Sequence, residues 1–249
     1  MMIVAHRGAS GDAPENTLAS FELAWRQGAD AIEGDFRLTK DGAIVCIHDA
    51  DTARVSDQSL IVIESTLQQL KRVDIGSYRG EQFAGERIPT LDEVIATIPD
   101  GKKILIEIKC ETEIVATLIN QLQQSKLTAE QVVIIAFDAR VIRACKDLAP
   151  QYEANWLNDF EQDFDIEKII PILIEIEAEG LSSNNESTKD LADAVLELGL
   201  AYHAGWAIDN IDLVQKMIDW GASSITTNNP YQLKKNLINR RLYFGKDKA

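Results

Sequence analysis

Short apolar runs alternate along the chain with longer segments in which apolar residues recur every three or four positions. The short runs indicate β-strands, and the clearest are MIVAH at 2–6, DAIEGDF at 30–36, AIVCIH at 43–48, KILIEIK at 103–109, VVIIAF at 132–137, YEANWL at 152–157, AYHAGWAI at 201–208 and SSITTN at 223–228. Helical patterns lie between most of them, at 17–27, 91–98, 111–124, 139–148, 165–179, 188–198 and 210–219. Repeated βα units of this kind favour a closed (β/α)8 barrel, the TIM barrel, over an open sheet.

Two features disturb this regular count. A further short run at 180–183 gives nine candidate strands, and only a Lys-Asp-Gly turn separates the second candidate strand from the third. Residues 49–88 are polar and poor in long apolar runs, so we expect a small insertion after the third strand, within a single barrel domain spanning 1–249. Thr90 and Glu93 can form a capping box where a helix begins. The basic tail from Lys234 predicts a final helix.

Composition and charge narrow the classes of partner. The 249-residue chain is 45% apolar and has a formal net charge of −15 at pH 7. This acidity disfavours a nucleic-acid or anionic-membrane partner, because such partners need a basic face. Cys46, Cys110 and Cys145 form no CxxC pair, which indicates a reducing compartment. The start MMIVAH resembles no signal peptide, and no window reaches the roughly 18 apolar residues of a membrane span. We expect a cytoplasmic protein without stable membrane association; the oligomeric state stays open.

Polar side chains gather at the carboxyl ends of the candidate strands. Alternate strand residues face the same side, so Glu33 shares a face with Asp35, and Glu107 shares one with Lys109. Barrel active sites are built at these strand ends, so one mouth is predicted to collect six side chains: His6, Glu33, Asp35, His48, Glu107 and Lys109. Three carboxylates there would repel one another unless a cation joined them. An all-oxygen ligand set suits Ca²⁺ or Mg²⁺ better than zinc.

The stretch VAHRGASGDAPENT at 4–17 combines folding signals with chemical ones. Gly8 permits a tight turn, and either Asn16 or Thr17 can cap the helix that follows. This explanation does not cover His6 and Arg7. A titratable ring beside a fixed cation at a strand end suits a phosphate site.

Each motif also has a purely structural explanation. Glu107 and Lys109 could form a buried ion pair, since buried charges must be paired. His48 and Asp49 could be a hydrogen-bonded surface pair. The joint placement of these motifs on successive strand ends favours the functional interpretation.

Eight motifs follow one another in order along the chain: HRG at 6–8, PENT at 14–17, E-x-D at 33–35, T-x-D-G at 39–42, HD at 48–49, IPTL-x-E at 88–93, E-x-K at 107–109 and TTNNP at 226–230. This ordered set resembles the glycerophosphodiester phosphodiesterase family. The motifs are dense over 3–109, whereas the second half matches mainly in spacing and in Trp206. The resemblance implies a (β/α)8 barrel with a small inserted segment that hydrolyses a small-molecule glycerophosphodiester to glycerol 3-phosphate and an alcohol.

The resemblance also implies roles for single residues. It makes Glu33, Asp35 and Glu107 ligands of a divalent metal, Ca²⁺ or Mg²⁺. His6 and His48 become the acid–base pair, which we assign as base and acid, respectively. The phosphate- and substrate-binding group comprises Arg7, Glu15, Asn16, Lys109, Phe137 and Trp206, in which Glu15 and Asn16 brace the loop. The nucleophile is either the glycerol 2-hydroxyl of the substrate or a metal-bound water.

One departure from the family pattern and two rival functions complete the expectations. Gly34 stands where the family usually has a bulky apolar residue, which predicts looser packing outside that strand.

A phospholipase C or D could use a similar barrel, but it would need an apolar rim that 49–88 does not offer. A non-catalytic phosphate-binding barrel is the other rival, and the presence of both His6 and His48 argues against it.

Overall fold

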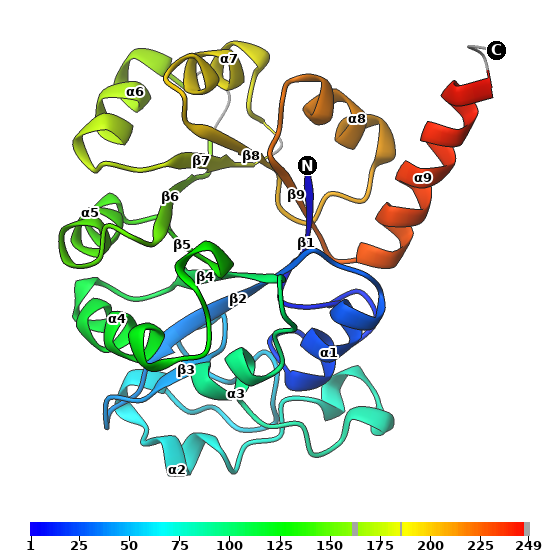
Figure 1. The fold of residues 1–249 in the computed structure, drawn as a ribbon. Helices are drawn as coiled ribbons and strands as arrows, with labels where there is room; N and C mark the ends of the chain where they lie inside the picture. Colours follow the sequence, from blue (N-terminus) through cyan, green and yellow to red (C-terminus); the bar gives the residue numbers. More distant parts are fainter. Residues whose placement is uncertain (161–163, 185, 247–249) are drawn as a thin grey trace.

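Parallel strands form a closed barrel in the computed structural model, which describes residues 1–160, 164–184 and 186–246 (Figure 1). Within these residues the sheet order is β1-β9-β8-β7-β6-β5-β4-β2-β3, and β1 also pairs with β2, so eight strands close on themselves. The strands are β1 (Met2–Ala5), β2 (Ala31–Leu38), β3 (Ile44–Cys46), β4 (Lys103–Ile108), β5 (Val132–Ala136), β6 (Glu153–Asn158), β7 (Gly180–Ser183), β8 (Ala201–Ala204) and β9 (Ser224–Thr227). The predicted TIM barrel is confirmed.

Helices surround the barrel and separate most successive strands (Figure 1). They are α1 (Leu18–Arg26), α2 (Leu67–Leu70), α3 (Leu91–Ala96), α4 (Val115–Gln124), α5 (Ala139–Leu148), α6 (Ile166–Glu175), α7 (Lys189–Glu197), α8 (Ile211–Asp219) and α9 (Pro230–Lys246). Short 3-10 helices span Val62–Glu64, Ser77–Arg79, Glu81–Phe83, Thr112–Ile114 and Ala129–Gln131. Each predicted helix lies within its expected range, and the tail forms the expected final helix. In the described ranges, no helix combines the length and apolarity needed to cross a bilayer.

The strand count differs from the prediction at two places. β3, which was expected as the third barrel strand, pairs antiparallel with β2 and lies outside the closed barrel. The turn between them is too short for the crossover that a parallel neighbour needs, so β3 can return beside β2 only as a hairpin. β7, the extra run at 180–183, takes the remaining place in the barrel.

The barrel wall separates two apolar regions. On the outside, helices bury one face against the strands, as α4 does with Leu118, Ile119 and Leu122. On the inside, a smaller cluster of inward-facing strand residues comprises Val4, Ala31, Leu105, Val133, Ile135 and Leu157. On β2 and β4 the same inward face continues to polar residues at the carboxyl ends, so the inner cluster forms an apolar floor beneath a polar mouth.

Residues 49–88 leave the barrel after β3 and return to it at α3 (Figure 1). They share a small apolar cluster with the β3 hairpin, made of Val45, Ile47, Val55, Val62, Leu70, Val73, Ile75 and Ile88. The Arg79 guanidinium donates hydrogen bonds to the carbonyls of Ser10 and Gly11, in the loop after β1. The segment therefore packs against the mouth of the barrel. At its end Thr90 caps α3 with Glu93, which confirms the predicted capping box.

Candidate active site

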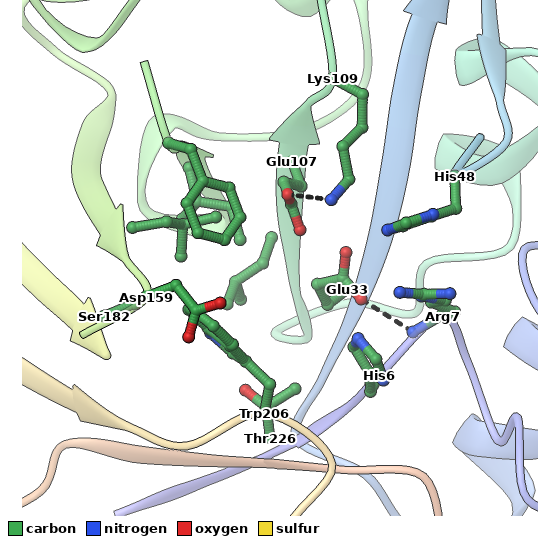
Figure 2. Close-up of a pocket in the computed structure, with 14 residues that line it drawn as sticks. His6, Arg7, Glu33, His48, Glu107, Lys109, Asp159, Ser182, Trp206 and Thr226 are labelled. Carbon is green, nitrogen blue, oxygen red and sulfur yellow. Dashed lines mark hydrogen bonds and ion pairs between the residues drawn. The ribbon is translucent and has the colours of Figure 1, made fainter. Parts of the chain in front are cut away.

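A cavity of about 260 Å³ opens at the carboxyl ends of the strands (Figure 2). Its lining combines the predicted polar residues with the apolar floor of the barrel: His6, Arg7, Glu33, His48, Leu105, Glu107, Lys109, Ile135, Phe137, Leu157, Asp159, Ser182, Trp206 and Thr226. The structure thus brings both histidines, both predicted phosphate-binding cations and two of the predicted metal ligands to one cavity. Asp35 lies directly behind it, fully buried.

The three predicted metal ligands form one buried carboxylate triad. Glu33 and Asp35 are two positions apart on β2, so both side chains lie on its inward face. The register of β2 with β4 sets Asp35 opposite Glu107. One carboxylate oxygen of each residue lies within 4.8 Å of the other two. Strand alternation and parallel pairing are therefore sufficient to assemble the triad.

The triad offers the donor set that a hard divalent cation requires. Glu33 Oε1 is buried without a hydrogen-bond donor among the described residues. Asp35 Oδ1 and Glu107 Oε1 also lack a hydrogen bond of good geometry, and their nearest cation is the Lys109 ammonium. Buried carboxylate oxygens that converge without donors suit a cation with oxygen ligands, so the residues present fit Ca²⁺ or Mg²⁺.

Burial and mutual repulsion perturb the triad's ionisation. Burial, together with the Asp35 and Glu107 charges, raises the pKa of Glu33 well above its usual range. Burial, together with the Asp35 charge, raises the pKa of Glu107 to about 7. Burial also acts to raise the pKa of Asp35, but the Lys109 and Arg7 charges outweigh it and lower that pKa overall. Full ionisation of the triad is therefore costly unless more positive charge is bound.

Arg7 and Lys109 supply cationic side chains at the mouth (Figure 2). Lys109 forms an ion pair with Glu107, and its Nζ lies 3.3 Å from Asp35 Oδ1. Arg7 Nε lies 3.2 Å from Asp35 Oδ2, and the Arg7 backbone N–H donates to Glu33 Oε2 at 2.8 Å. Arg7 holds a left-handed φ of 54°, which is uncommon for a residue other than glycine and marks this turn as a constrained one.

His6 is oriented by a neutral amide. Its Nδ1 lies 2.8 Å from Asn228 Oδ1, and because an amide oxygen only accepts hydrogen bonds, Nδ1 carries the proton. Nε2 is then the nitrogen with a free lone pair. Burial, aided by the Arg7 charge, lowers the pKa of His6 to about 4. At neutral pH His6 is therefore an uncharged imidazole that can accept a proton.

His48 is oriented by a carboxylate instead. The β3 hairpin carries it back to the level of Asp35, because the Ile47 N–H donates to the Asp35 carbonyl at 2.8 Å. Its Nδ1 lies 2.6 Å from Asp49 Oδ1. Burial lowers the pKa of His48 overall, although the Asp35 charge and the hydrogen bond to Asp49 act to raise it. The two histidines thus differ in the group that holds them.

Arg37 connects the two segments that carry His48 and Lys109. It continues the inward face of β2 above Asp35, and its Nε donates to the His48 carbonyl at 2.9 Å. Its Nη1 donates to the Lys109 carbonyl at 2.7 Å. One planar guanidinium therefore fixes the backbones of both segments relative to each other.

Glu15 and Asn16 do not line the cavity but support the residues that do. Glu15 Oε1 accepts a hydrogen bond from Arg7 Nη1 at 2.8 Å. Asn16 Nδ2 donates to Asp35 Oδ2 at 2.7 Å, and Asn16 Oδ1 accepts from the Asp35 N–H at 3.2 Å. Of the two candidate helix caps, Thr17 is the one that caps α1.

The expected loose packing around Gly34 is wrong. A Cβ atom added there would lie 3.1 Å from Cys46 Sγ, 3.2 Å from Phe21 Cζ and 3.3 Å from Phe36 Cε2. The neighbouring side chains have closed over the glycine, so the volume that a larger residue would take is already filled.

The aromatic residues form one wall of the cavity. Phe137 follows β5 and Trp206 follows β8, and their ring centroids are 5.3 Å apart in an edge-on contact. Lys109 Nζ lies 5.5 Å from the centroid of the Phe137 ring, a cation–π distance. The two predicted substrate-binding aromatic residues therefore lie in the same cavity as the histidines.

Sequence reasoning missed several residues of the site. A signal existed for Asn228, inside the TTNNP motif, and for Arg37, which shares the alternation of Glu33 and Asp35. Arg54, which donates to both Glu15 and Asp49, lies in the polar segment 49–88 and had no signal. Asp159 lines the cavity, and its place after β6 was the signal available for it.

A TIM barrel whose mouth combines two histidines, two cations and a carboxylate triad that could hold a divalent metal is typical of enzymes that act on phosphate esters. The comparisons make this assignment specific. The model of the "Glycerophosphoryl diester phosphodiesterase family" matches residues 6–232, and the chain belongs to this family. The resemblance found in the sequence is thereby confirmed.

Similar proteins agree over nearly the whole chain. A glycerophosphodiester phosphodiesterase of Caldanaerobacter subterraneus is 33% identical over 241 residues, covering 93% of this chain and 96% of its own. One from Bacillus subtilis is 29% identical, covering 92% of this chain and 84% of its own. A solved Oleispira antarctica phosphodiesterase, in complex with the product sn-glycerol-3-phosphate, is 28% identical with a TM-score of 0.87, covering 95% of this chain and 96% of its own.

Proposed function

We propose that the chain hydrolyses glycerophosphodiesters to sn-glycerol 3-phosphate and an alcohol, with a divalent metal at the carboxylate triad and with His6 and His48 transferring the protons. The observation that carries this proposal is the unequal pair of histidines facing one triad, one held by the Asn228 amide and the other by the Asp49 carboxylate. Family membership and the product bound to the Oleispira relative support the substrate class.

Charge neutralisation of the phosphate comes from several groups. Glu33, Asp35 and Glu107 would hold Ca²⁺ or Mg²⁺, which when bound supplies positive charge beside a phosphate oxygen. Arg7 and Lys109 donate hydrogen bonds to the non-bridging oxygens. Such fixed positive groups favour the transition state, where negative charge on the phosphoryl oxygens is greatest.

The histidines divide the proton transfers of the first step. His6 Nε2 takes the proton of the glycerol 2-hydroxyl while that oxygen forms a bond to phosphorus. The bond from phosphorus to the alcohol oxygen breaks, and protonated His48 gives its proton to that oxygen. The products of this step are the free alcohol and a cyclic glycerol phosphate. General acid and base contributions of this kind are typically worth about 10² to 10⁴ in rate each.

The second step reverses the roles. Neutral His48 takes a proton from water as the water oxygen bonds to phosphorus. The ring bond from phosphorus to the 2-oxygen breaks, and protonated His6 returns its proton to that oxygen. Glycerol 3-phosphate leaves, and both histidines recover their starting protonation.

Two measurements test the proposal. The chelated protein should release no glycerol 3-phosphate from glycerophosphocholine, glycerophosphoethanolamine or glycerophosphoglycerol, and added Ca²⁺ or Mg²⁺ should restore release. Full activity after chelation would contradict the proposal that the reaction needs a divalent metal. A phosphocholine diester lacking only the 2-hydroxyl should bind competitively yet react at least about 10³-fold more slowly, because it loses the internal nucleophile. A rate close to that of the parent would exclude the cyclic intermediate.

A further inference from the structure

The cavity wall opposite His48 and Arg7 carries polar groups that the proposed reaction does not use. Asp159 follows β6 and Ser182 belongs to β7, and both line the cavity on this side, whereas Thr226 lines it from β9, which pairs with β1. Figure 2 shows the Asp159 carboxylate pointing into the cavity from this side. Ser182 and Thr226 are 6% and 8% exposed, whereas Asp159 is exposed at the mouth.

One oxygen of Asp159 is already held. The side-chain amide of Asn184, in the loop after β7, donates to Asp159 Oδ1 and also to the Phe160 carbonyl at 2.8 Å. This double contact fixes the amide and, through it, the direction of the carboxylate. An ionised carboxylate accepts hydrogen bonds at both oxygens, so Oδ2 keeps its capacity to bind a donor in the cavity.

A carboxylate in this position repels a phosphate and attracts a neutral hydrogen-bond donor. The phosphate is held on the other side, by Arg7, Lys109 and the triad. Between the two sides lies the apolar floor of Leu105, Ile135 and Leu157, which suits a short carbon skeleton. The cavity therefore offers phosphate binding at one side, carbon contacts in the middle and a hydroxyl acceptor at the other side.

We propose that Asp159 accepts a hydrogen bond from the terminal hydroxyl of the substrate's glycerol and thereby selects glycerophosphodiesters over diesters in which that oxygen carries an acyl chain. This inference rests on the proposed function. Figure 2 shows His6 on the same side of the triad as Trp206 and Thr226. If His6 takes the 2-hydroxyl proton, the glycerol lies on that side and its terminal hydroxyl is directed toward the Asp159 wall.

Acylation of the terminal oxygen removes the donor and leaves the carboxylate facing an apolar chain. A site that hydrogen-bonds a substrate hydroxyl discriminates against an analogue that lacks it, here because an acyl chain laid over the carboxylate displaces its water without supplying a donor. Asp159 therefore favours water-soluble diesters as substrates over lysophospholipids, in which the terminal oxygen is acylated.

The test compares kcat/KM for glycerophosphocholine with that for its analogue lacking only the terminal hydroxyl. The wild type should prefer the parent by about tenfold or more, the effect of one hydrogen bond to a charged group. Asp159→Ala should lose rate on the parent while keeping its rate on the analogue, so the preference falls to near one. Asp159→Asn keeps a carbonyl acceptor and should retain part of the preference. Asp219→Ala is a matched control, because Asp219 also accepts from a side-chain amide but lies on α8.

Three results would contradict the inference. Equal rates of the wild type on parent and analogue would show that the hydroxyl is not recognised. An equal loss on both substrates in Asp159→Ala, or an unchanged preference in both Asp159 variants, would show that Asp159 does not recognise it. If the wild type hydrolyses neither substrate with metal added, the proposed function is overturned, and this inference with it. If Asp159→Ala does not fold, an unchanged preference in Asp159→Asn is sufficient to contradict the inference, and a reduced preference supports it.

Discussion

The pKa of Glu107 gives a measure of the repulsion within the carboxylate triad. Burial and the Asp35 charge raise that pKa to about 7 from an unperturbed value of 4.5. A carboxyl whose pKa is higher in the folded chain binds more protons when folded than when unfolded. Its contribution to stability is therefore lost as the pH rises from about 4.5 through about 7. The difference between the two pKa values corresponds to a loss of about 3 kcal/mol in the free energy of unfolding above pH 7.

The histidines act in the opposite direction. Burial lowers the pKa of His6 to about 4 and also lowers the pKa values of His48 and His203. Each of these groups binds fewer protons in the folded chain, so each adds stability as the pH rises toward its unfolded pKa. The stability of the wild type mixes these opposing terms. The informative quantity is therefore the difference between the wild type and Glu107→Gln at each pH.

Thermal unfolding in chelator from pH 4.5 to pH 8.5 measures this difference. The midpoints of wild type and Glu107→Gln should be closest near pH 4.5, and by pH 8 the variant should be higher by about 6–12 °C, as about 3 kcal/mol implies for a chain of this size. Added Ca²⁺ or Mg²⁺ at pH 8 should stabilise the wild type more than the variant. Glu111→Gln, an exposed carboxylate after the same strand, is the control. A difference between Glu107→Gln and the wild type that does not change with pH would refute the reasoning.

The remaining predictions concern turnover. His6→Ala and His48→Ala should each lower kcat by at least about 10² with little change in thermal midpoint, and near-normal turnover would remove that residue from the mechanism. Arg37→Gln should lower kcat by about tenfold and Arg37→Lys by less, because the guanidinium holds the His48 and Lys109 carbonyls in place. Lys146→Gln, which removes a donor to carbonyls before β6, should reduce stability but leave kcat unchanged. An equal loss of kcat in Lys146→Gln and Arg37→Gln would make Arg37 merely structural.

Strand alternation predicted the direction of a side chain wherever that direction depends on a single strand. Glu33 and Asp35 lie on the inward face of β2, Glu107 lies on that of β4, and Lys109 continues this face directly after the strand, as the period of two predicts. The same rule applied to Arg37, but an arginine near a strand end has so many ordinary surface roles that its position did not identify it.

Strand number was harder to predict because it depends on which runs become neighbours. β7 reads GLSS, small and polar, and gives a weaker strand signal than the IVC of β3. The strength of the strand signal does not decide which segment joins the barrel, because β7 is one of its strands and β3 is not. His48 reaches the mouth for the same reason, because β3 returns antiparallel beside β2.

Arg54 shows how segment 49–88 takes part in the site without lining the cavity. Its Nη1 and Nη2 each donate to Glu15 at 2.8 Å, and its Nε donates to Asp49 at 2.5 Å. Glu15 holds Arg7 and Asp49 holds His48, so one guanidinium supports both the cation proposed to bind phosphate and a ring proposed to transfer protons. These contacts join loops that no periodicity relates, and their spacing is set by the way the segment's own apolar cluster packs beside β3. The orientation of both groups therefore depends on the packing of a segment that contains neither of them.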